Sequence, residues 1–132
     1  MRPGQTRSLS LRTVPEGRLV SPVVALADSF LARLWGLMGQ SELPPGHALY
    51  LPGTNSIHML FMRFAIDCLF LGTPAADGTQ RVVALRRALP PWRGVVWYVR
   101  GAKGVVELPS GALHEAGLSV GDLVKLEAAR ED

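Results

Sequence analysis

Glycine and proline interrupt this sequence so often that little of it can form a helix of ordinary length. The chain has 132 residues, of which 14 are Gly and 10 are Pro. Between them lie short segments rich in Val, Leu and aromatic residues, as in β-strands joined by turns. We therefore predict a mainly β protein, either a small antiparallel β-sandwich or a partly closed barrel.

The predicted strands follow from these apolar segments and from the turn signals between them. Pro15-Glu16-Gly17 indicates a turn, so the first two strands should form a hairpin. Asp77-Gly78 indicates a second hairpin turn. The segments that we assign to strands are 9–14, 18–27, 48–51, 57–61, 65–71, 81–89, 95–99, 103–108 and 122–127.

One helix is expected over residues 28–38, and a short helical turn over 110–116. Asp28 is a good N-cap, because its carboxylate can accept hydrogen bonds from the first amides of a helix. Apolar residues then recur at steps of three and four, which places them on one face: Phe30, Leu31, Leu34, Leu37 and Met38. In the shorter element, Ser110 is the expected cap and Gly117 the expected end.

The length of the chain fits a single domain with one core. We expect residues 1–8 to be a flexible lead, 9–128 to form the domain and 129–132 to be a tail. The single cysteine, Cys68, rules out an internal disulfide and a zinc site of the paired-cysteine type.

The segment 19–27 follows several arginines and ends in Ala-x-Ala, as a secretory signal does. However, Pro22 splits its short apolar core, and Glu16 and Gly17 interrupt the approach to it. No other run is long and apolar enough to span a bilayer. We therefore expect a cytoplasmic protein without membrane insertion.

Three segments in a fixed order resemble the family known as domain of unknown function 192. They are residues 27–43 with Gly36-Leu37-Met38, residues 56–71, which read SIHMLFMRFAIDCLFL, and residues 105–111 followed by Gly117-Leu118 and Gly121-Asp122. Much of the family carries Trp-Met-Lys-Asn-Thr where this chain has the segment from His58, and Leu60 and Cys68 also depart from the pattern. The resemblance implies a compact β fold. It supplies no catalytic roles, because the family has no agreed activity.

His58, Arg63 and Asp67 are the first candidates for a binding site. If strands 57–61 and 65–71 are antiparallel neighbours, a histidine that titrates near neutrality would meet a carboxylate and a guanidinium. The same residues also have a purely structural interpretation. Asp67 can bond Arg63 or backbone amides, and His58 can be a half-buried ring whose nitrogens are satisfied.

Trp92, Arg93 and Glu107 complete the tentative ligand-binding set. Trp92 and Arg93 follow two prolines, and Glu107 lies inside an apolar strand, where an inward carboxylate would need a partner. The chain has 3 His, and their positions lack the spacing of metal ligands, so we expect no metal. No motif indicates a cofactor or a nucleophilic active site.

Residues 81–103 are basic and contain no acid. Their six cations are Arg81, Arg86, Arg87, Arg93, Arg100 and Lys103. Trp92, Trp97 and Tyr98 lie among them, and aromatic faces between cations suit stacking on bases while phosphates are neutralised. The routine alternative is that these arginines are the solvated faces of strands, since the formal net charge is a modest +3.

The sequence thus leaves the function open. Our first hypothesis is a non-enzymatic accessory module that binds a small polar or anionic ligand, or a peptide, at the candidate residues His58, Arg63, Asp67, Trp92, Arg93 and Glu107. The second is single-stranded nucleic-acid binding through residues 81–103, and the third is a small hydrolase-like enzyme that uses His58 and Asp67.

Overall fold

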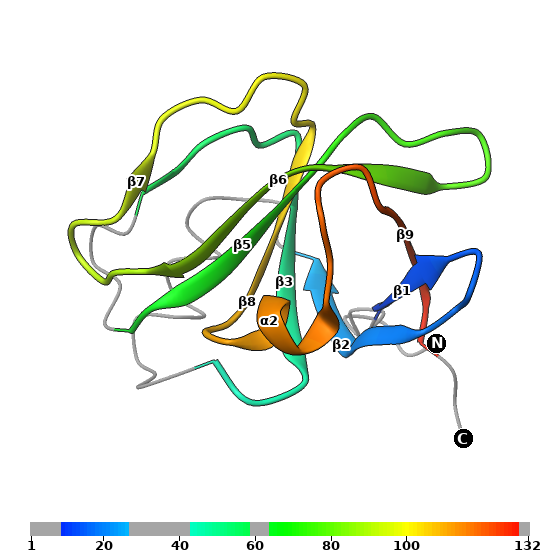
Figure 1. The fold of residues 1–132 in the computed structure, drawn as a ribbon, viewed down its shortest axis with the longest axis horizontal. Helices are drawn as coiled ribbons and strands as arrows, with labels where there is room; N and C mark the ends of the chain where they lie inside the picture. The colour runs from blue at the N-terminus through cyan, green and yellow to red at the C-terminus, as the bar shows by residue number, and fades with distance from the viewer. Residues whose placement is uncertain (1–8, 27–42, 59–63, 130–132) are drawn as a thin grey trace, which may run out of the picture.

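A computed structural model of the chain describes residues 9–26, 43–58 and 64–129. Seven strands form a closed barrel, and two short strands form a separate ribbon beside it (Figure 1). The prediction of a mainly β protein with a barrel is confirmed, and the barrel is fully closed. The elements in chain order are β1 (Leu9–Val14), β2 (Leu19–Leu26), β3 (His47–Pro52), β4 (Ile57–His58), β5 (Ile66–Leu71), β6 (Thr79–Leu89), β7 (Val95–Val96), β8 (Gly104–Pro109), α2 (Ala112–Ala116) and β9 (Leu123–Ala128).

The barrel has the strand order β1-β2-β3-β8-β5-β6-β9, and β9 pairs with β1 to close it. Its pairs are antiparallel except for β2 and β3, which run parallel. A parallel pair needs a crossover connection rather than a hairpin, and here the chain between β2 and β3 supplies it. Both predicted hairpins, β1–β2 and β5–β6, are present.

The turn between β5 and β6 follows the chemistry of its sequence. The backbone N–H of Thr79 donates to the Asp77 carboxylate at 2.9 Å, and that bond lowers the pKa of the carboxyl. Gly78 has a positive φ of 89°, which glycine adopts without strain.

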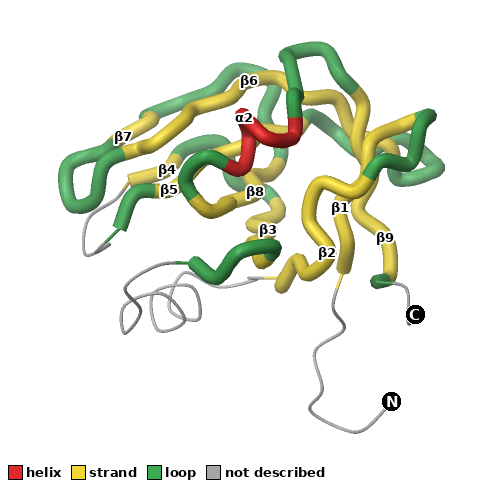
Figure 2. The backbone as a smooth tube through the Cα atoms, turned by 60° about the horizontal axis from the view of Figure 1, so that its bottom comes forward, coloured by secondary structure: helices red, strands yellow, loops and turns green. Residues whose placement is uncertain are grey.

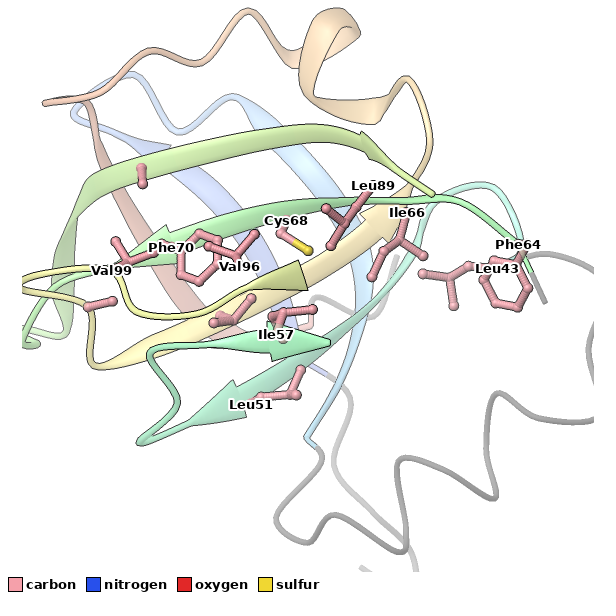
Figure 3. Close-up of a cluster of buried hydrophobic side chains, with 13 residues drawn as sticks. Leu43, Leu51, Ile57, Phe64, Ile66, Cys68, Phe70, Leu89, Val96 and Val99 are labelled. Atoms are coloured by element: carbon pink, nitrogen blue, oxygen red, sulfur yellow. The ribbon is translucent and has the colours of Figure 1, made fainter. Parts of the chain in front are cut away.

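Strand β5 is buried along its whole length because the sheet is covered on both faces. Ile66, Cys68 and Phe70 point to the outer face, where the β4–β7 ribbon covers them (Figure 3). Leu69 and Leu71 point into the barrel. This is why the β5 sequence, apart from Asp67, is apolar at successive positions rather than at alternate ones.

The ribbon made by β4 and β7 lies at the opposite side of the molecule from β1, β2 and β9 (Figures 1 and 2). The hypothesis of a site at His58, Arg63 and Asp67 depended on segments 57–61 and 65–71 being antiparallel neighbours, and within the described residues they are not. Both edges of β5 are already paired, with β6 and β8, so β4 pairs with β7 instead. Ile57 of β4 therefore packs on top of the β5 sheet rather than beside it.

The short helical turn expected near residue 110 is present as α2, but its cap differs from the prediction. The N-cap residue is Gly111, at a φ of 97°, and it makes no side-chain cap hydrogen bond. The helix expected over residues 28–38 lies outside the described residues. Within the described part of the chain, no helix is long and apolar enough to cross a membrane.

Candidate binding surface

Asp67 is fully buried, and its carboxylate points toward the barrel side of β5. Oδ1 accepts a hydrogen bond from the N–H of Ala88 at 2.8 Å. Oδ2 accepts from the N–H groups of Gly111 and Leu113, each at 3.0 Å. The carboxylate thus takes the place of a side-chain cap for α2, and it joins β5, the end of β6 and α2 at one point.

Asp67 also accepts a hydrogen bond from a strained piece of backbone. Ala88 has a positive φ of 50°, which a residue with a Cβ adopts at a cost of about 1 kcal/mol. Since the N–H of Ala88 is one of the three donors to Asp67, the carboxylate helps to hold this conformation. These contacts make Asp67 a structural residue whose oxygens are occupied by backbone donors.

His58 and Trp92 lie at the same end of the ribbon, although 34 positions separate them in the sequence. The backbone of His58 pairs with Val95, three residues after Trp92. Trp92 has a positive φ of 68° in a tight turn, closed by bonds from the N–H of Gly94 to Pro90 and from the N–H of Arg93 to Pro91. The structure brings these backbones together, while Arg63 lies outside the described residues.

Glu107 lies on the other face of the sheet from Asp67. In β8, Val105 belongs to the outer core while Val106 and Leu108 belong to the barrel core, so Glu107 faces outward, beneath the ribbon side. It is 7% exposed and pairs in register with Cys68 of β5. Asp67 and Glu107 therefore cannot act on one ligand from the same side of the sheet.

Cys68, which points to the same outer face of the sheet as Glu107, is a buried thiol. Burial raises its pKa well above the ordinary value, and the negative charge of Glu107 raises it further. A protonated, buried thiol is a poor nucleophile and a poor metal ligand. Within the described residues, no group of three or more His, Cys, Asp or Glu side chains comes together to hold a metal ion.

The ribbon exposes apolar side chains on its outer face. Val96 and Val99 are buried in the outer core, whereas Val95 and the two residues after β7, Trp97 and Tyr98, are exposed. Trp97 is 83% exposed, Tyr98 67%, Trp92 53% and Val95 40%. We call these four residues, three of them aromatic, the aromatic ribbon, as distinct from the β4–β7 ribbon itself. Large apolar side chains that are exposed together often mark an interaction site.

Five cations lie in the same stretch of the chain as the aromatic ribbon. Arg86, Arg87, Arg93, Arg100 and Lys103 are all exposed, and the stretch that holds them contains no acid. Of the candidate residues named from the sequence, Trp92 and Arg93 belong to this surface. Trp97 and Tyr98 were also named from the sequence, as stacking residues of the second hypothesis, whereas Val95 was not. The signal that could have marked Val95 is that residues 95–99 are apolar or aromatic at every position, although the structure leaves Val95, Trp97 and Tyr98 exposed.

The described residues thus form a small domain, a closed β barrel that carries an exposed aromatic ribbon. The DUF192 family model, described as "Uncharacterized ACR", matches residues 12–126. This chain belongs to that family, as the resemblance in the sequence indicated.

Relatives of known sequence or structure agree with this assignment. The chain is 34% identical over 122 residues to a UPF0127 protein of Thermococcus sibiricus, covering 88% of this chain and 73% of the relative. It is 38% identical over 117 residues to a UPF0127 protein of Pyrococcus furiosus, covering 83% and 90%.

Two crystal structures share the fold. One is a Sinorhizobium meliloti protein provisionally described as a transcription regulator, with a TM-score of 0.70, 26% identity and 95% of each chain covered. The other is a protein of unknown function from Novosphingobium aromaticivorans, with a TM-score of 0.69, 21% identity and coverage of 95% of this chain and 90% of that one.

Proposed function

We propose that this protein is a non-enzymatic module that binds single-stranded nucleic acid through the aromatic ribbon and the cations around it. One observation carries the proposal. Trp97 and Tyr98, which directly follow β7, have 83% and 67% of their surface open to solvent. Open aromatic faces are the platforms on which unpaired bases stack, at about 1–3 kcal/mol per base.

The charges around these rings support an anionic partner. Arg93 and Arg100 flank the aromatic segment, and Lys103 follows it in the same acid-free stretch. Guanidinium groups neutralise phosphates and also stack on bases. A chain-like ligand can contact rings and cations in succession, whereas a small ligand would need an enclosed pocket to bury most of its surface.

The other functions left open by the sequence have less support. A small-ligand site or a hydrolase built on His58 and Asp67 needs an accessible carboxylate, and that of Asp67 accepts three backbone hydrogen bonds in the barrel. A peptide ligand would have to be acidic to suit the cations, and it is therefore an outcome of the test below. The Sinorhizobium meliloti relative, provisionally described as a transcription regulator, is in keeping with a nucleic-acid partner.

The compartment belongs to the same proposal. A chain with one cysteine has no disulfide to gain from an oxidising compartment. We propose that the protein acts in the cytoplasm, where single-stranded nucleic acid is available.

The proposal is tested by titrating the protein with an oligothymidylate of about ten nucleotides at several salt concentrations. If three to five phosphates are neutralised, log K should fall against log salt with a slope of roughly −2 to −3.5. A polyglutamate peptide serves as the competing anion. Binding of polyglutamate without binding of the oligonucleotide would favour an acidic protein partner and overturn the proposal.

Two matched variants separate the surface from net charge. Arg93→Gln removes a cation beside the aromatic ribbon, and Arg81→Gln removes one at the far end of β6, where the strand pairs with β9. Both lower the net charge equally. We expect the first to weaken binding by about three- to tenfold and the second to change it little. Equal losses would mean that charge alone attracts the ligand.

A further inference from the structure

A second site is suggested at the other side of the barrel, where α2 meets the start of β2 and the end of β8. A cavity of about 310 Å³ lies there. β2 pairs with β3 only from Val23 onward, and β3 pairs with β8 only up to Glu107. The strands therefore diverge at this end, and the gap between them is the cavity. Ligand sites commonly lie in the mouths of barrels.

The walls of the cavity are held in place by specific hydrogen bonds. Arg18 donates from Nη1 to the carbonyl of Ala116 at 2.6 Å, which ties the end of α2 to the β1–β2 hairpin. Ser21, 1% exposed, donates to the carbonyl of Gly46 at 2.7 Å. Leu108, also 1% exposed, supplies part of the apolar lining. The start of α2 is fixed from inside by Asp67.

The lining carries both signs of charge. Arg18 contributes a guanidinium, of whose donors one is engaged by Ala116 among the described contacts, and Glu115 contributes a carboxylate from α2. A guanidinium fork matches a ligand carboxylate, and a side-chain carboxylate accepts from an ammonium group. A ligand that carries both a negative and a positive charge can therefore contact both residues at once.

We propose that this cavity binds a small zwitterion that carries a carboxylate and an ammonium group, as a free α-amino acid does. Arg18 receives the carboxylate, Glu115 the ammonium group, and the apolar lining the side chain. The volume is at the lower limit for ligand pockets, about 300 Å³, and so it suits a ligand of this size. The proposal is independent of nucleic-acid binding, since the aromatic ribbon contributes no residue to the cavity.

The test is an amide NMR titration of the full chain with each of the common L-amino acids. At least one should shift the signals of Gly46, Ala112 and Ala116 in a saturable way. Its analogue without the amino group and its analogue without the carboxylate should each bind about tenfold more weakly, the loss of roughly one charged contact. No shift with any amino acid would overturn the proposal, as would equal affinity for either analogue.

Variants provide the second arm. Glu115→Gln should weaken binding about tenfold, because it removes the negative charge that faces the ammonium group without touching the bonds that anchor α2. Asp77→Asn, at the distant β5–β6 turn, is the matched control and should leave the affinity unchanged. Arg18→Lys keeps the charge but loses the fork, so it should weaken binding while the fold, checked by the same spectra, persists. Unchanged affinity in Glu115→Gln would contradict the site.

Discussion

The buried carboxylate of Asp67 gives the sharpest prediction about stability. In Asp67→Asn the side chain keeps its shape, but one of its two oxygens becomes an NH2 group that cannot accept. If the remaining oxygen stays toward Gly111 and Leu113, the N–H of Ala88 loses its acceptor and faces a donor instead. If the amide turns over, the two amides of α2 lose theirs.

The magnitude follows from the three bonds. A hydrogen bond to a charged group contributes about 1.5–3 kcal/mol and a neutral one about 1 kcal/mol. Losing one charged bond and weakening two others to neutral bonds should lower the free energy of unfolding by about 3–5 kcal/mol. This is a large share of the roughly 5–15 kcal/mol of a typical domain.

Urea unfolding followed by tryptophan fluorescence measures this change, with hydrogen exchange of the Ala88, Gly111 and Leu113 amides as a local readout. Asp77→Asn is the control, because that carboxylate accepts one backbone N–H in an open turn; its unfolding midpoint should shift far less than that of Asp67→Asn. A loss below about 1 kcal/mol in Asp67→Asn would refute the role of Asp67 as the anchor of α2.

Two further predictions concern the packed sheet. The raised pKa of Cys68 means that the folded protein keeps a proton that the unfolded thiol releases above about pH 9. The difference in free energy of unfolding between the wild type and Cys68→Ala should be independent of pH below about pH 9. Above it, the wild type should lose up to about 1.4 kcal/mol per pH unit relative to the variant, and stability curves that stay parallel would contradict this. A Cβ on Gly104 would lie 2.8 Å from the Tyr50 ring, so Gly104→Ala should lower the free energy of unfolding by about 1–3 kcal/mol. Gly72→Ala, whose nearest neighbour would be at 3.4 Å, should cost less, and equal losses in a urea titration would show that Tyr50 moves freely.

Local chemistry made much of the fold predictable. The turn residues at Pro15 and Gly78 mark the two hairpins, and strand segments separated by them lie within a few residues of their predicted bounds. The pairing of β4 was not predictable, because strand order depends on which edges remain open after the barrel closes. The cap of α2 was missed for a similar reason: its acceptor, Asp67, lies 44 residues before Gly111.

The candidate site was predictable only where local pattern and surface coincide. Trp92 and Arg93 lie on the surface that we propose for binding, as their place between prolines and cations indicated. Asp67 and Glu107 have the chemistry of a site, but the alternation of β5 and β8 puts them on opposite faces of one sheet. Tertiary pairing sets which face of the sheet a strand residue occupies, because a one-residue change of register turns every side chain of that strand to the opposite face.

The most direct measurement of the central claim is the affinity of Trp97→Ala for oligothymidylate, compared with that of Val120→Ala. Val120 is also exposed, at 64%, but its neighbour Gly121 donates to the carbonyl of Val82, in the part of β6 away from the aromatic ribbon. Stacking on the ribbon predicts that Trp97→Ala loses about five- to 100-fold in affinity, while Val120→Ala binds as the wild type does. Equal affinity in the two variants would show that the aromatic ribbon does not hold the bases.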